Sequence, residues 1–84
     1  MKIDTKLRRL RKGNTLFIKG KEYHVIKKER TTIVEHKPLN EILIWLTDNR
    51  MISVDNDGYN VYKMIRLGPI QLLWRIWKKP TIKF

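Results

Sequence analysis

The chain has no cysteine among its 84 residues, which excludes a disulfide framework or a thiolate metal site as a support for its core. No apolar run approaches the roughly 20 residues that a membrane-spanning helix needs. The basic N-terminus also lacks the apolar segment that a secretory signal peptide would place behind it. These absences predict a cytoplasmic protein, and the length predicts a single domain over residues 1–84.

Acidic residues are scarce and unevenly placed. Eight Asp and Glu stand against nineteen Lys and Arg, which gives a net charge of +11. Residues 1–37 hold twelve bases and four acids, residues 38–62 one base and four acids, and residues 63–84 six bases and no acid. This distribution predicts a polarised electrostatic field and an anionic partner.

The polar residues do not form a catalytic or metal-binding pattern. His24 and His36 have no serine, cysteine or aspartate at the spacing of a nucleophilic triad. Residues 55–58 begin like a calcium loop, but Asn60 and Arg66 stand where that loop requires Gly and Glu, so we interpret them as a hairpin turn. The sequence therefore predicts a non-enzymatic protein with no cofactor and no metal.

Short runs rich in Val, Ile, Thr and Tyr fill the chain between residues 13 and 66, and they predict a meander of antiparallel strands. Gly13 and Gly20 bracket the first run, where glycine supplies the positive φ of a tight turn. In the second run, alternation places Tyr23, Val25 and Lys27 on one face. The expected strands are residues 14–19, 22–28, 30–35, 42–47, 50–54 and 59–65.

Residues 1–12 form a basic lead with the pattern of one or two helical turns. Asp4 suits the N-terminal end, and Gly13 suits the left-handed residue that ends a helix. Leu7 and Leu10 share one face. Because so short a helix is marginal in water, we expect these two leucines to pack on the barrel.

The segment from residue 69 to residue 79 is amphipathic and fits two structures. Pro69 at a helix start and the ten-residue length favour a helix with Ile70, Leu73, Trp74 and Trp77 in one stripe. As a strand, the same segment would turn alternate residues inward, and periodicity does not separate the two. The helix is the interpretation we carry forward.

Together these elements predict a mostly β (α+β) fold, a small antiparallel barrel of five to six strands over residues 13–66 with a short N-terminal helix and a C-terminal amphipathic helix. Residues 12–15 (KGNT) and 20–25 (GKEYHV) resemble the opening of Src-homology-3-like small barrels. They also resemble an uncharacterised bacterial domain family that later carries a Trp-Leu strand, here at residues 44–46. The resemblance implies a fold and no functional residue.

Basic residues interleaved with aromatics predict contact with nucleic acid, RNA in particular, or with a ribonucleoprotein surface, through backbone phosphates. Tyr23, Tyr59, Tyr62 or Trp45 would stack on bases if exposed. The expected nucleic-acid-binding residues are Arg8, Arg9, Arg11, Lys12, Lys19, Lys21, Lys27 and Lys28.

The Trp-rich C-terminal segment fits either packing across the open end of the barrel, as part of the core, or contact with other partners. Trp is common in interface hot spots, so one alternative is a protein-interaction module of phage or accessory-gene type, or a homodimer. Another is attachment to a membrane surface through an amphipathic segment with basic flanks. The expected partner-binding residues are Leu72, Trp74, Ile76 and Trp77.

Overall fold

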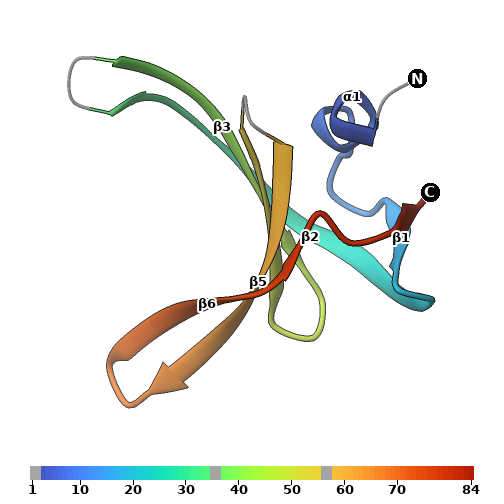
Figure 1. Ribbon diagram of the computed structural model, residues 1–84. Helices are drawn as coiled ribbons and strands as arrows, with labels where there is room; N and C mark the ends of the chain where they lie inside the picture. The colour runs from blue at the N-terminus through green and yellow to red at the C-terminus, as the bar shows by residue number, and fades with distance from the viewer. Residues whose placement is uncertain (1–2, 35–36, 56–57) are drawn as a thin grey trace.

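A computed structural model describes the backbone of residues 3–34, 37–55 and 58–84, and the side chains of residues 3–30, 41–55 and 58–84. One short helix precedes a series of strands (Figure 1). The elements are α1 (Ile3–Arg8), β1 (Thr15–Ile18), β2 (Lys21–Val34), β3 (Lys37–Leu46), β4 (Arg50–Asp55), β5 (Gly58–Leu67), β6 (Ile70–Lys78) and β7 (Ile82–Lys83).

The described strands form one antiparallel sheet in the order β6-β5-β4-β3-β2-β1-β7. This confirms a mostly β fold with a short N-terminal helix, but the expected closed barrel of five to six strands is wrong. The sheet has seven strands and is not closed, because β6 and β7 are its two edges. Residues 79–81 connect these edges, and the Tyr59 hydroxyl donates to the Pro80 carbonyl at 2.8 Å while Lys19 N–H donates to the Thr81 carbonyl at 3.1 Å.

The expected C-terminal helix is also wrong, because residues 70–78 form strand β6. Gly68 has φ of +62° and Pro69 follows it, so these two residues form the tight turn of the β5–β6 hairpin, in which Leu67 pairs with Ile70. Glycine at the first central position suits such a turn. Pro69 therefore belongs to a hairpin and not to the first turn of a helix.

The second and third expected strands are one strand, β2, which bends at irregularities. Its pairing with β3 shifts between Val25 and Lys27 and again between Thr31 and Ile33. Such a shift marks a bulge, where one extra residue lets a strand bend without ending. In Figure 1 the outer parts of the β2–β3 and β5–β6 hairpins both extend to the left, away from α1.

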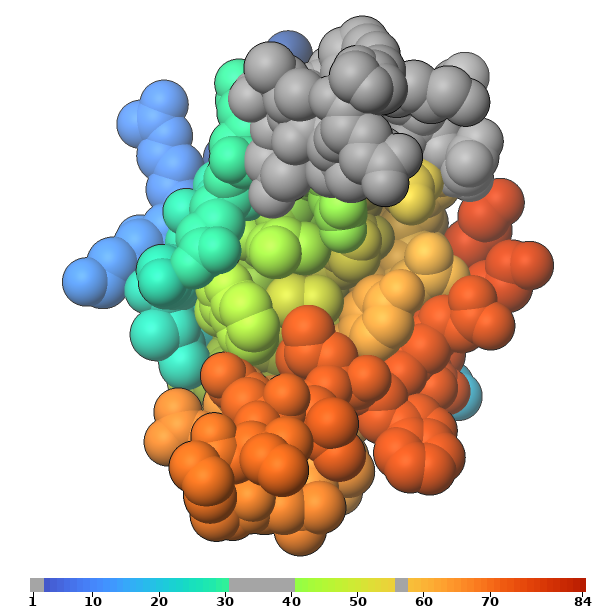
Figure 2. All heavy atoms as spheres, turned by 90° about the vertical axis from the view of Figure 1, so that its left-hand side faces the viewer, coloured from blue at the N-terminus to red at the C-terminus, as the bar shows by residue number. Residues whose placement is uncertain are grey.

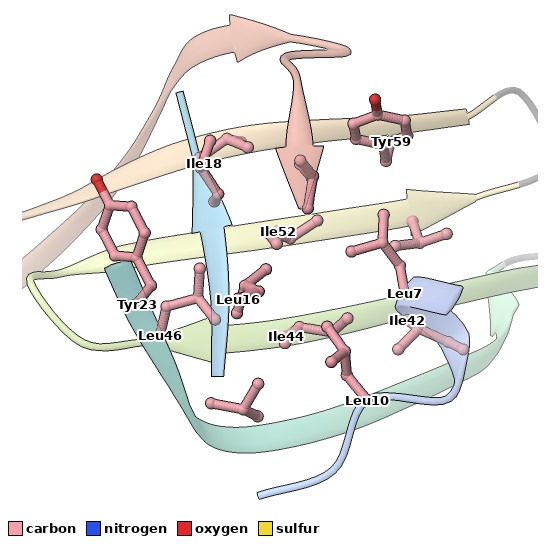
Figure 3. Close-up of a cluster of buried hydrophobic side chains, with 14 residues drawn as sticks. Leu7, Leu10, Leu16, Ile18, Tyr23, Ile42, Ile44, Leu46, Ile52 and Tyr59 are labelled. Atoms are coloured by element: carbon pink, nitrogen blue, oxygen red, sulfur yellow. The ribbon is translucent and has the colours of Figure 1, made fainter. Parts of the chain in front are cut away.

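One face of the sheet, which we call the core face, is covered by α1, β1 and β7. Leu7 and Leu10 are buried there as expected, and Figure 3 shows both over Ile42 and Ile44. Arg8 Nη2 donates to the Asp55 carbonyl at 3.3 Å, which ties α1 to the end of β4. The opposite face, which we call the second face, carries no helix among the described elements.

No helix in the described part of the chain has the length and apolarity needed to cross a bilayer.

Candidate nucleic-acid interface

A row of five side chains crosses the second face of the sheet. The strand registers pair Lys27 of β2 with Trp45 of β3, Trp45 with Met51 of β4, Met51 with Tyr62 of β5, and Tyr62 with Arg75 of β6. Paired residues project to the same side of a sheet, and neighbouring strands lie about 4.8 Å apart. The row therefore carries two aromatic residues two strands apart, with the buried Met51 between them and a cation at each end.

The bulge at Ile26 creates one end of this row. Tyr23 and Val25 are buried on the core face, and simple alternation would place Lys27 with them. Ile26 is instead the extra residue of the bulge, so Lys27 pairs with Trp45 on the second face. The expectation that Tyr23, Val25 and Lys27 share a face is thus wrong.

A hollow of about 420 Å³ lies on the second face beside Trp45. Figure 2 looks onto this face and shows β3 and β4 recessed between β2 (teal) and the end of the β5–β6 hairpin (orange). The Trp45 indole Nε1–H is buried and has no hydrogen-bond partner. The lining residues are Ile26, Lys27, Glu29, Trp45, Leu46, Asp48, Asn49, Arg50, Met64, Arg66 and Gln71.

A second, open hollow of about 580 Å³ adjoins the first. It is lined by Arg11, Lys12, Ile26, Lys27 and Lys28, so Ile26 and Lys27 belong to both hollows. Six bases and two acids line the two together. The result is one continuous basic surface that runs from the segment after α1 across the bulge onto the aromatic row.

The expected nucleic-acid-binding residues divide into three groups, of which two are separated along β2. Arg11, Lys12, Lys27 and Lys28 come together at the second hollow. Lys19 and Lys21 lie at the β1–β2 turn, roughly 20 Å away along β2.

The two turn lysines have contacts of their own. Lys19 Nζ is 5.1 Å from the centre of the Trp77 ring, and Lys21 Nζ is 2.6 Å from Asp48 Oδ2. That ion pair raises the pKa of Lys21 and lowers the pKa of Asp48, first through the hydrogen bond and then through charge attraction. Lys19 and Lys21 therefore lie apart from the second hollow, although Lys21 pairs with Asp48 at the first.

The remaining expected bases, Arg8 and Arg9, lie at the end of α1 or just after it. Arg8 is close enough to Lys28 for its charge to affect the lysine. The structure thus brings Arg8 to the edge of the same basic surface.

Lys27 forms an ion pair with Glu29, in which its Nζ is 2.5 Å from Oε1. Both side chains are substantially exposed, and exposed ion pairs contribute only about 0–1 kcal/mol. The ion pair therefore does little to hold Lys27 in place.

Lys28 lies on the core-face side of the bulge and is partly buried. Its ammonium donates to the Arg8 carbonyl. Burial, followed by the charges of Arg30, Arg11 and Arg8, lowers the pKa of Lys28. These like charges crowd together in the free protein, and an anion bound among them would relieve their repulsion.

The lowered pKa of Lys28 has a measurable consequence for stability. The folded state releases this proton at a lower pH than the unfolded state, so between the two pKa values the unfolded state binds more protons and the free energy of unfolding rises with pH. A Lys28→Met variant lacks this contribution. Denaturant unfolding from about pH 7 to about pH 10 should show wild type gaining stability relative to the variant. If the difference in stability between wild type and variant stayed constant with pH, the lowered pKa of Lys28 would be contradicted.

The aromatic residues considered for stacking on bases include two that are buried and two that are partly exposed. Tyr23 and Tyr59 are buried in the core, as Figure 3 shows, and are not accessible to bases. Trp45 and Tyr62 are partly exposed on the second face.

Three further arginines were not predicted from the sequence. Arg66 and Arg75 reach the second face through the strand pairing. Arg50 pairs with Leu46 and Lys63 on the core face and lines the first hollow beside the β3–β4 turn.

The four residues expected to bind a protein partner differ in burial. Ile76 and Trp77 pack against the core, whereas Leu72 and Trp74 are exposed on the β5–β6 hairpin. The register places Leu72, Trp74 and Trp77 on the same face, so they differ because the packed core reaches Trp77 and does not reach the end of the hairpin.

The residues considered for catalysis or metal binding show no such arrangement where they are described. His24 is exposed, with Nδ1 3.0 Å from the Thr15 hydroxyl and Nε2 3.6 Å from Glu22. His36 and residues 56–57 of the expected turn lie outside the described residues, although Asp55 and Gly58 pair as a hairpin requires. Among described residues, no group of three or more His, Asp or Glu could hold a metal ion.

Comparison with known proteins found no family model, no curated protein and no solved structure that matches this chain. The resemblance to Src-homology-3-like barrels accordingly stays a prediction.

Proposed function

We propose that this protein is a non-enzymatic module that binds single-stranded nucleic acid, free or within a ribonucleoprotein. The phosphates would contact the basic surface around Lys27, and the bases would lie on the row between Lys27 and Arg75. The observation that carries this proposal is the joining of the two hollows at Ile26 and Lys27, directly beside Trp45.

The chemistry of the surface favours single strands over duplexes. Bases stacked on aromatic side chains contribute about 1–3 kcal/mol each, and only unpaired bases present their faces. Trp45 and Tyr62 supply two such rings on one face. The cations lie around these rings and not on a projecting helix, which favours backbone contacts without sequence choice.

Salt dependence tests this proposal. Six bases line the joined hollows, and each phosphate contact on a single strand contributes about −0.7 to the slope of log affinity against log salt. A slope of about −4 is expected, which is a loss of roughly 300-fold between about 50 and 200 mM salt. Filter binding with a single-stranded oligonucleotide and the matching duplex measures it.

Three results would contradict the proposal. The first is an affinity that does not change with salt, and the second is tighter binding of the duplex than of the single strand. Failure to bind either form near physiological salt would also reject it.

A further inference from the structure

The β5–β6 hairpin carries an apolar surface that the nucleic-acid proposal does not use. Five of the eight exposed large apolar side chains in the described part of the chain lie within residues 67–74. Trp74 is 65% exposed and Leu67 61%. This concentration lies at the end of a hairpin that projects from the sheet (Figure 1).

Most of these side chains share one face of the hairpin. The register pairs Lys63 with Trp74, Ile65 with Leu72, and Leu67 with Ile70. These six residues, which we call the hairpin ladder, continue the face on which Val61 pairs with Trp77. The hairpin ladder is thus an extension of the core face that α1, β1 and β7 do not cover.

The positive charge around the hairpin ladder indicates which kind of molecule could bind there. Residues 63–84 contain six bases and no acid, and the whole chain has a net charge of +11. A second copy of the chain would bring like charges together, which costs free energy. The occupant must therefore combine negative charge with an apolar interior.

We propose that the hairpin ladder docks on an anionic lipid surface. Leu67, Ile70, Leu72 and Trp74 would enter the boundary between head groups and acyl chains, with the uncharged turn at Gly68 and Pro69 leading. From Lys63 to Leu67 the strand advances roughly 13 Å, comparable with the 5–10 Å depth at which interfacial segments lie. Lys63 and Arg75 lie farther from the turn and remain at head-group level, where basic side chains are attracted to anionic lipids.

Sedimentation with vesicles tests this proposal. Wild-type protein should pellet with vesicles that contain about 30% anionic lipid and remain in the supernatant with zwitterionic vesicles. The double variant Leu72→Ser/Trp74→Ser should lose about tenfold or more in partition coefficient. Phe17→Ser is the matched control, because Phe17 is also exposed but lies on β1, and it should bind like wild type.

A second readout does not depend on the double variant folding. Vesicles with brominated acyl chains should quench tryptophan fluorescence in wild type, and Trp74→Phe should remove that quenching while still binding. No binding to anionic vesicles, or equal binding by the folded double variant, would overturn the proposal and leave an acidic protein strand on the β6 edge as the occupant to test. Oligonucleotide affinity of the double variant should equal that of wild type, which separates this proposal from the nucleic-acid site.

Discussion

Replacing Arg11, Lys12, Lys27 and Lys28 together with Gln should weaken binding of a single-stranded oligonucleotide by roughly 10²- to 10³-fold at about 0.1 M salt. These four residues line the second hollow and would account for four of the six phosphate contacts proposed for the joined surface. Each lost contact removes about 0.7 from the slope, which should fall from about −4 to about −1.4. Filter binding over a salt series measures both quantities.

The control for this variant removes the same charge elsewhere. Lys6, Lys78, Lys79 and Lys83 are exposed and do not line either hollow, and replacing them with Gln gives the same net charge. Charges beyond a screening length of about 10 Å contribute little at 0.1 M salt, so this control should keep most of the affinity. If the two quadruple variants lose affinity equally, binding depends on net charge and no localised site exists.

Leu7→Ala should lower the free energy of unfolding by about 2–5 kcal/mol. Leu7 is fully buried where α1 covers the core face, and truncation leaves a cavity that a small core cannot readily close. A loss of this size should lower the melting temperature by roughly 10–30 °C in a domain of this length. Chemical denaturation with a circular-dichroism signal measures the change.

Leu67→Ala makes the same chemical change at an exposed position and should stay within about 0.5 kcal/mol of wild type. Because Leu7 also fixes the segment that carries Arg8, Arg11 and Lys12, Leu7→Ala should reduce oligonucleotide affinity as the native population falls. A Leu7→Ala protein as stable as Leu67→Ala would show that α1 is not part of the core.

Local sequence patterns were sufficient to predict the elements whose structure depends mainly on neighbouring residues. Leu7 and Leu10 are three residues apart and are buried as a short helix on a sheet requires. Gly13 and Gly20 have positive φ, as glycines that end one element and turn to the next should. Arg11 and Lys12 are adjacent in the sequence, so their clustering could be predicted from the sequence.

The composition of the basic surface was not predictable in the same way. Alternation along β2 fails at Ile26, and the bulge that moves Lys27 beside Trp45 is set by pairing with a strand about twenty residues later. Arg66 and Arg75 reach the surface through the β5–β6 hairpin, so no window of the sequence contains the site. Register is a property of the folded sheet, and local patterns do not encode it.

The choice between helix and strand for residues 70–78 depended on the same long-range information. Its apolar residues fit both periods, but strand β5 offers backbone hydrogen-bond partners one tight turn away. A helix of that length would have to nucleate without help. Pairing with strand β5 (Gly58–Leu67) therefore decides that residues 70–78 form a strand, and the pattern of residues 70–78 alone does not.

The central claim is that nucleic acid lies against the second face beside Trp45, and the indole N–H signals of the three tryptophans test it most directly. In an NMR titration with a single-stranded oligonucleotide, the Trp45 signal should shift as the complex forms, because Trp45 lines the hollow next to Lys27. The Trp74 signal should stay in place, because Trp74 lies in the hairpin ladder on the opposite face. A saturating titration that leaves Trp45 unmoved would contradict the account.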